Sequence, residues 1–303
     1  MKEAIVSVRD LSKSYGPVVG VSGVSFELRR GEIMGLLGPN GAGKTTTLEC
    51  LEGIRQPDSG TMRILGINPS RESRRLCNVI GVQLQTSGLP ATMTPPEAMR
   101  FFCAYHGVAP RYDLLERLGL GEKLKAQYRE LSTGQQRRLA LAVAHQPPIL
   151  ILDEPTAGLD VGSRSVLHEV MAGMRNAGTA ILLATHDMAE AEKMADRVAI
   201  LLRGRIVASG TPRELTATGS GLTKVSVATE QSVLQNSNHP FPAVHQWLVK
   251  DDYAIFYSAD PGPTVAALLD YVKMQGDKLI DLRVERPSLE ERFLEITNAG
   301  GAR

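Results

Sequence analysis

The chain has 303 residues, 43% of them hydrophobic, and a formal net charge of +1. This length and composition suit one large or two modest domains with packed cores, and they exclude a globally disordered chain. The balanced charge, with a pI of about 7.8, excludes a nucleic-acid-binding protein held by bulk electrostatics.

Hydrophobic runs and a glycine-rich segment begin the chain. Residues 4–9 and 24–29 have the pattern of strands, and Ile33–Leu37 has that of a buried strand. The next segment, Gly38 to Thr45, fits the pattern G-x-x-x-x-G-K-T, and residues 46–51 continue like a helix. Glycines let successive N–H groups point inward at a phosphate, and the helix N-terminus adds positive potential. The alternative is a glycine-rich turn between strand and helix that has no ligand.

In a phosphate-binding loop, each residue type has its own task. Lys44 would reach the β- and γ-phosphates, and the Thr45 hydroxyl would ligate Mg²⁺. The candidate nucleotide-binding residues here are Gly38, Pro39, Asn40, Gly41, Ala42, Gly43, Lys44, Thr45 and Thr46.

A helical segment follows two further short strands, expected at 63–66 and 79–82. Between residues 86 and 145 the pattern is helical, and Thr94–Glu97 begins a helix with a Thr/Glu capping pair and proline in its first turn. A second helix is expected at 111–125, although glycines interrupt it, and a third at 137–145, before two prolines.

Two features of this helical segment have a plain and a sharper interpretation. Arg137-Arg138, like the basic cluster at 71–75, indicates a solvated helix face rather than a binding patch. Ser132 resembles an N-cap, so the peptide Ser132–Gln135 is either an ordinary helix cap or a second phosphate-binding edge at a helix N-terminus.

Two carboxylates follow the next buried strand, Ile149–Leu152. At the C-terminal edge of this strand, Asp153 could hold Mg²⁺ beside the phosphate loop. Glu154, one residue further on, could orient or deprotonate the attacking water. The alternative is a strand that ends in a solvated acidic turn.

The α/β pattern then continues to a small second unit. A helix at 166–176, a strand at 180–184, a helix at 188–195 and a strand at 198–202 complete a mostly parallel sheet with a helical insertion. Small and polar residues at 216–221 indicate a boundary. Beyond it we expect strands at 224–228, 253–257 and 279–284, with helices at 264–274 and 288–296.

Cysteines and apolar runs exclude further classes. Cys50, Cys77 and Cys103 show neither metal-binding spacing nor a disulfide framework, which favours a reducing cytosol. The N-terminus lacks a signal-peptide pattern, and the longest apolar runs are far shorter than the roughly 20 residues that span a bilayer.

These motifs together resemble the ATPase subunit of an ATP-binding cassette (ABC) transporter. The phosphate loop, the Leu-Ser-x-Gly-Gln peptide at 131–135 and the Ile-Leu-Ile-Leu-Asp-Glu strand occur in that family's order. The resemblance covers about residues 4–217 and implies an α/β P-loop NTPase fold with a mostly parallel core sheet, an antiparallel β subdomain and a helical subdomain at about 86–145. We expect an ABC ATPase domain at 1–217 and a small α+β accessory or dimerisation domain at 218–303.

The resemblance assigns roles to single residues. It implies that Tyr15 stacks on adenine, that Asp160 lies at a dimer seam, and that His186 contacts the γ-phosphate. Gln85 would contact Mg²⁺ and water, with Gln83 a less favoured choice. The catalytic set is Glu154, His186, Lys44 and Gln85; the metal ligands are Thr45, Gln85 and Asp153; Ser132, Gly134 and Gln135 complete the nucleotide contacts. The peptide departs from the family's usual Leu-Ser-Gly-Gly-Gln at Thr133.

The resemblance also implies cofactors and partners. ATP and Mg²⁺ would join two subunits head to tail, more favourably a homodimer than a heterodimer, and the pair would drive integral membrane subunits from the cytoplasmic face of the plasma membrane. The tail Pro287–Leu294 resembles that of drug-export ATPases such as the daunorubicin-resistance group, or else is an amphipathic helix that caps the small domain. The alternative function is a soluble ABC-type ATPase that acts on ribosomes or nucleic acid.

Overall fold

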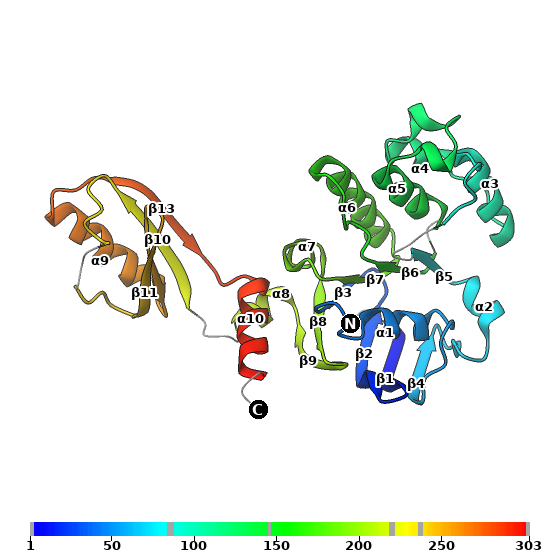
Figure 1. The fold of residues 1–303 in the computed structure, drawn as a ribbon, viewed down its shortest axis with the longest axis horizontal. Helices are drawn as coiled ribbons and strands as arrows, with labels where there is room; N and C mark the ends of the chain where they lie inside the picture. The colour runs from blue at the N-terminus through cyan, green and yellow to red at the C-terminus, as the bar shows by residue number, and fades with distance from the viewer. Residues whose placement is uncertain (1–2, 84–87, 145–146, 218–221, 236–238, 301–303) are drawn as a thin grey trace. The chain divides into compact units, whose positions relative to one another are not determined.

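The computed structural model describes residues 3–83, 88–144, 147–217, 222–235 and 239–300 (Figure 1). The chain divides into two compact units, Met1–Pro212 and Arg213–Arg303. The division falls a few residues before the boundary that the small polar residues predict. Among the described residues, none of the helices is both long and apolar enough to cross a bilayer.

The centre of the first unit is a six-stranded sheet in the order β5-β6-β7-β3-β8-β9 (Figure 1). All neighbouring strands are parallel except β8 and β9, which are antiparallel. The strands are β3 (Ile33–Leu37), β5 (Ile80–Gln83), β6 (Ile149–Asp153), β7 (Ala180–Thr185), β8 (Arg197–Leu202) and β9 (Arg205–Gly210). The predicted mostly parallel core sheet is confirmed.

Strand β3 lies between β7 and β8, and β6 lies on the other side of β7. All residues of β3, β6 and β7 are buried, which explains their continuous apolar sequences. The carboxyl ends of these three strands meet at one edge of the sheet, because the strands are parallel. This edge therefore gathers the phosphate loop, the two carboxylates and the histidine segment.

A second, antiparallel sheet in the order β2-β1-β4 completes the β structure of this unit. Its strands are β1 (Ala4–Tyr15), β2 (Val18–Arg29) and β4 (Ser59–Ile64). Apolar residues of both sheets share one buried cluster, in which Val8, Leu28 and Met62 from this sheet join Leu36 and Ile151 from the central one. This packing fixes the β1–β2 hairpin beside the phosphate loop.

The helices of the first unit begin with α1 after the phosphate loop and include a group formed by α3, α4 and α5 (Figure 1). Their bounds are α1 (Lys44–Leu51), α2 (Ser73–Cys77), α3 (Pro95–His106), α4 (Tyr112–Arg117), α5 (Thr133–Val143), α6 (Val161–Asn176), α7 (Met188–Met194) and, at the unit boundary, α8 (Pro212–Ala217). The predicted Thr94/Glu97 capping box is present at the start of α3. Glu97 accepts the Thr94 backbone N–H at 2.8 Å.

The helix predicted at 111–125 is wrong in its extent. Helix α4 ends at Arg117 because Gly119 adopts φ +67°, and the chain then forms only a short 3-10 turn at Gly121–Lys123. The third helix begins earlier than its predicted start at 137, since the Ser132 cap places the first helical residue at Thr133.

The second unit is an antiparallel sheet in the order β11-β12-β10-β13 with helix α9 against it (Figure 1). Its elements are β10 (Thr223–Thr229), β11 (Val244–Lys250), β12 (Tyr253–Ser258), β13 (Leu279–Glu285), α9 (Pro261–Met274) and α10 (Leu289–Gly300). Its core joins Val225, Val227 and Phe256 of the sheet to Leu268 and Val272 of α9. The sequence analysis missed β11, an edge strand whose residues are mostly exposed.

Candidate active site

The loop between β3 and α1 has the backbone that a phosphate cradle requires. Gly43 adopts φ +106°, and a Cβ atom there would lie 2.4 Å from the backbone oxygen of Gly20. At Gly38 a Cβ atom would lie 2.3 Å from the oxygen of Leu201. Only glycine fits such close approaches, so the glycine positions of the motif follow from packing as well as from conformation.

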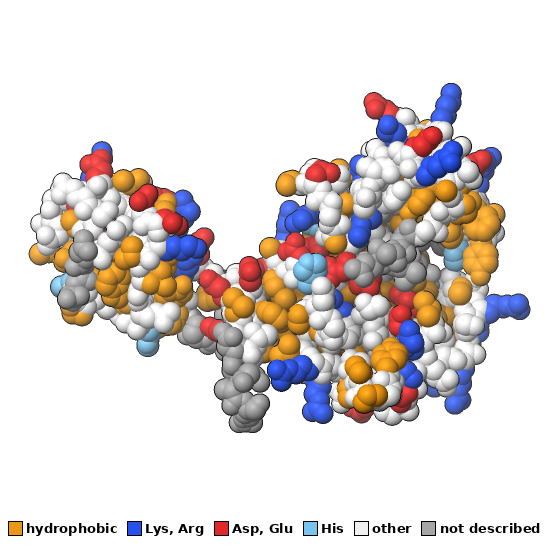
Figure 2. Space-filling model, viewed as in Figure 1, with side chains coloured by type: hydrophobic (Ala, Val, Ile, Leu, Met, Phe, Trp, Pro, Cys, Tyr) orange, Lys and Arg blue, Asp and Glu red, His pale blue; other side chains and the backbone are white. Residues whose placement is uncertain are grey.

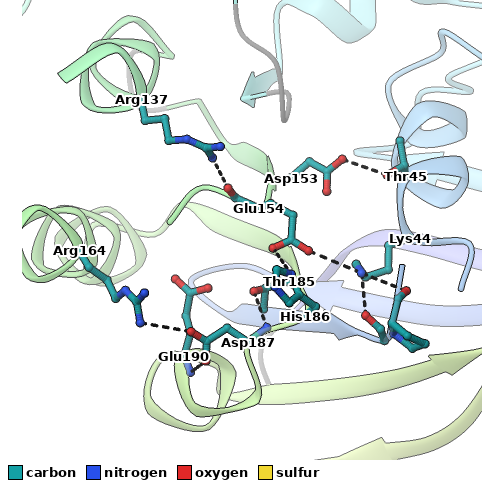
Figure 3. A network of polar contacts seen from close by, with 12 residues as sticks. Lys44, Thr45, Arg137, Asp153, Glu154, Arg164, Thr185, His186, Asp187 and Glu190 are labelled. Atoms are coloured by element: carbon teal, nitrogen blue, oxygen red, sulfur yellow. Dashed lines mark hydrogen bonds and ion pairs between the residues drawn. The ribbon is translucent and has the colours of Figure 1, made fainter. Parts of the chain in front are cut away.

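Lys44 is buried at the base of this loop, with 6% of its surface exposed. Its ammonium donates to the backbone oxygens of Gly38 at 2.7 Å and Pro39 at 3.3 Å. The same Nζ lies 3.6 Å from Oε1 of Glu154. The phosphate loop therefore surrounds the Lys44 ammonium, which also lies next to the Glu154 carboxylate (Figure 3).

Asp153 ends strand β6 and faces the first turn of α1. The Thr45 hydroxyl donates to its Oδ2 at 3.1 Å (Figure 3). Burial raises the pKa of the Asp153 carboxyl, while the bond from Thr45 opposes that shift. A hydroxyl and a carboxylate oxygen, both hard oxygen donors of the kind that Mg²⁺ prefers, thus converge here.

Glu154 follows with a left-handed backbone, at φ +50°. Its N–H donates to the backbone oxygen of Ala184 at 2.9 Å, and Nδ1 of His186 lies 2.8 Å from its Oε2 (Figure 3). The carboxylate is buried, whereas 56% of the His186 side chain is exposed. Lys44 and His186 hold the two oxygens of one carboxylate, as the sequence order alone could not show.

Arg137 of helix α5 donates a hydrogen bond to the backbone oxygen of Glu154 (Figure 3). Its neighbour Arg138 donates to the backbone oxygens of Leu118 at 2.8 Å and Gly134 at 3.3 Å. The prediction that this arginine pair lies on a solvated helix face is therefore wrong. No local pattern gave a signal for the bonds to Glu154 and Leu118, because these backbone carbonyls are distant in sequence.

Tyr15 lies at the end of β1, beside the phosphate loop. Its hydroxyl is 3.4 Å from Oγ1 of Thr46, and the Arg55 guanidinium lies 5.0 Å from the ring centroid. Tyr15, Val18 and Val19 line one side of a cleft of about 400 Å³, whose other side includes Lys44 and Glu154. Val18 and Val19 are exposed here, and the sequence analysis did not single them out.

The Leu-Ser-x-Gly-Gln peptide does not line this cleft. Ser132 caps α5, with its Oγ accepting the Gln135 N–H at 3.3 Å while the Gln135 side chain accepts the Ser132 N–H at 2.9 Å. Thr133 takes the first helical position, where a negative φ suits threonine. A Cβ atom on Gly134 would lie 3.4 Å from side-chain atoms of Leu159 and Ser163.

Asp160 lies in the same region and caps α6. Its carboxylate accepts from the Ser163 N–H at 2.8 Å and the Ser163 hydroxyl at 2.7 Å, and these bonds lower its pKa. Gln85 lies outside the described residues. Gln83, the less favoured choice, is the buried last residue of β5.

Comparison with known proteins gives one consistent result. The family model described as "ABC transporter" matches residues 21–157. A Nod factor export ATP-binding protein I of Ralstonia nicotianae is 36% identical over 97% of this chain and 94% of its own length. A linearmycin resistance ATP-binding protein of Bacillus subtilis is 31% identical over 97% of this chain and 98% of its own.

Solved structures resemble about two thirds of the chain in the same way. An ATP-binding subunit of an ABC transporter has a TM-score of 0.66 and 30% identity, and covers 70% of this chain and 91% of that one. A dimeric ATP-binding cassette bound to ADP and Pi has a TM-score of 0.62 at 23% identity, which shows a shared fold.

Proposed function

The chain belongs to the ATP-binding subunits of ABC transporters, and we propose that it hydrolyses ATP to power export through separate membrane subunits. The observation that carries the proposal is the contact of one buried carboxylate, Glu154, with both Lys44 and His186 beside the phosphate loop. Relatives similar over nearly the whole chain are named as export or resistance proteins. Their names favour export over the alternative of an ATPase that acts on ribosomes or nucleic acid.

We assign triphosphate binding to residues 38–46, with adenine stacked on Tyr15. The backbone N–H groups of the loop and the start of α1 favour an anion, and Lys44 would move from its carbonyl partners to the phosphate oxygens. Thr45 and Asp153 would hold Mg²⁺, because their hydroxyl and carboxylate oxygens already converge. When bound, that ion would neutralise charge on the phosphates.

Glu154 would orient and deprotonate the attacking water, and His186 would contact the γ-phosphate. The Glu154 carboxylate is buried and has a lysine and a histidine as its partners, so its two oxygens are fixed in direction. Gln85 is assigned a place beside Mg²⁺ by resemblance alone.

We further propose that a second copy completes the site. Ser132, Gly134, Gln135 and Asp160 do not line the cleft, which supports the proposal that they contact nucleotide held by another subunit. A head-to-tail homodimer would bring each cleft against the partner's Leu-Ser-x-Gly-Gln peptide. The domain at 218–303 would pack on its counterpart and support this dimer.

The membrane partner would bind at a groove beside helix α3, on the cytoplasmic face of the membrane. This "α3 groove" has a volume of about 390 Å³ and is lined mainly by apolar side chains, among them Ile54, Val82, Leu89, Phe102, Tyr105 and Val143. Hydrophobic side chains gather on the surface around α3 (Figure 2). A short cytoplasmic helix of the partner would fit there and would receive motion from the helical segment.

Two experiments test these proposals. Affinity purification of the full chain from detergent-solubilised membranes should recover an integral membrane subunit. Glu154→Gln should slow ATP hydrolysis by about 10²–10⁴-fold and accumulate ATP-bound dimers in gel filtration. Glu169→Gln, at an exposed position on α6, is the matched control and should behave like the parent. Hydrolysis by Glu154→Gln at the parental rate would remove Glu154 from its assigned role.

A further inference from the structure

The α3 groove contains one carboxylate in an otherwise largely apolar lining. Glu52 is the C-cap residue of α1 and contributes to the groove wall. Its Oε2 atom is buried and has no hydrogen-bond partner among the described residues. Glu49, one turn earlier on the same helix, has its carboxylate paired with Arg55 at 2.6 Å. Glu49 and Glu52, one turn apart, thus differ in whether a described residue supplies a cation.

The charges that act on Glu52 are unfavourable for its ionised form. Burial is the largest cause that raises its pKa, to about 7, and the negative charges of Asp153 and Glu49 add to it. None of the causes of the shift is a cation that would oppose it. An ionised carboxylate in this partly buried position is costly unless it gains a positively charged partner.

Apolar side chains around Glu52 are exposed in the way that a docking surface requires. Ile54 is 64% exposed and Tyr105 is 68% exposed, and both line the groove with Glu52. Burial of these side chains under a helix would remove water from the carboxylate too. The affinity of the occupant then depends strongly on whether it brings a positive charge to that point.

We propose that the helix that fills the α3 groove inserts one lysine or arginine side chain against Glu52, with apolar residues on either side of it contacting Ile54 and Tyr105. The inference rests on the proposed function, because it takes the occupant to be a cytoplasmic helix of the membrane partner. It adds the chemistry by which the groove recognises that helix. An acidic helix would be rejected by the same carboxylate.

The position of Glu52 at the end of α1 connects the proposed ion pair to the phosphate-binding loop. Helix α1 begins with Lys44, in the phosphate loop, and ends at Leu51, next to Glu52. One short helix therefore has the phosphate site at its start and the proposed ion pair at its end. Formation of the pair would fix the end of the helix whose other end holds the triphosphate.

The test uses the full chain and the membrane subunit that co-purifies with it. Glu52→Gln should lower the amount of subunit captured at least about tenfold, because it leaves the partner's desolvated cation without a counter-charge. Glu52→Lys should lower it further, because it places two positive charges together. Glu49→Gln is the matched control, and we expect capture at the parental level. ATP affinity of the isolated Glu52→Gln chain should equal that of the parent, which separates lost docking from lost folding.

Charge exchange then identifies the partner residue. Each lysine and arginine in the cytoplasmic helices of the captured subunit is changed to glutamate, and one such change should restore capture by Glu52→Lys. Parental capture by Glu52→Gln and Glu52→Lys, or failure of every exchange to restore capture, would overturn the ion pair and leave the proposed function standing. If the parental chain captures no membrane subunit, the proposed function fails and this inference fails with it.

Discussion

Replacement of Glu52 by glutamine should make the isolated chain more stable at alkaline pH. The pKa of Glu52 is raised from 4.5 to about 7, mainly by burial. The folded chain therefore binds this proton more tightly than the unfolded chain does. The resulting stability is fully present below pH 4.5 and is lost as the pH rises through 7. Glutamine cannot ionise, so it avoids that loss.

The size of the effect follows from the shift. One pKa unit corresponds to about 1.4 kcal/mol, so a rise from 4.5 to about 7 gives a ceiling of about 3.5 kcal/mol. The side chain is incompletely buried, and solvent screening reduces the expected gain to about 2 kcal/mol. For a unit of this size, that gain raises the melting temperature by about 4–8 °C.

Circular dichroism melts of parent and variant between pH 5.5 and 8.5 measure the gain, with hydrogen exchange of the α1 peptide as the local readout. Fluorescence is unsuitable because the single tryptophan, Trp247, lies in the second unit. Glu49→Gln should show no such gain, since it breaks the pair with Arg55. A gain for Glu52→Gln that is equal at both ends of the pH range would refute the reasoning.

Three further variants probe the cleft and the bond between Arg137 and the Glu154 backbone. Lys44→Ala should weaken ATP binding by about 10–100-fold in equilibrium dialysis, because it removes a charged hydrogen-bond donor to the phosphates; unchanged affinity would contradict the assignment. Tyr15→Ala should weaken binding by about 3–10-fold while Tyr15→Phe keeps it, since stacking needs the ring and not the hydroxyl; equal losses would argue against stacking. Arg137→Met should lower kcat about tenfold with KM for ATP unchanged, because it releases the Glu154 carbonyl; a change in KM alone would place Arg137 in binding instead.

Much of the fold was predictable because its signals are local. Strands β3, β6 and β7 are short apolar runs with a motif at the end of each, and parallel pairing brings those ends together. The Thr94/Glu97 cap was predictable for the same reason, because it is formed within three residues. Ser132 was identified as a possible N-cap, but its reciprocal partner Gln135 was not.

The remaining features depend on packing between distant segments. Glu52 ends a helix and has the sequence pattern of an exposed residue, yet its Oε2 is buried in the groove wall. Arg137 looked solvated, but its guanidinium bonds a backbone oxygen in the turn after β6. Such features arise from tertiary contacts, which local patterns do not encode.

Helix α5 links two places that act on different nucleotides in the proposed dimer. Ser132 caps its first turn, and one turn later Arg137 donates a hydrogen bond to the backbone oxygen of Glu154 in the same subunit. In that dimer, contact of the opposite subunit's ATP with the peptide would displace the start of α5, and the helix would transmit the displacement through Arg137 to Glu154. The two ATP sites of the dimer should then act cooperatively, and the rate of hydrolysis should depend on ATP concentration along a sigmoidal curve instead of a hyperbola.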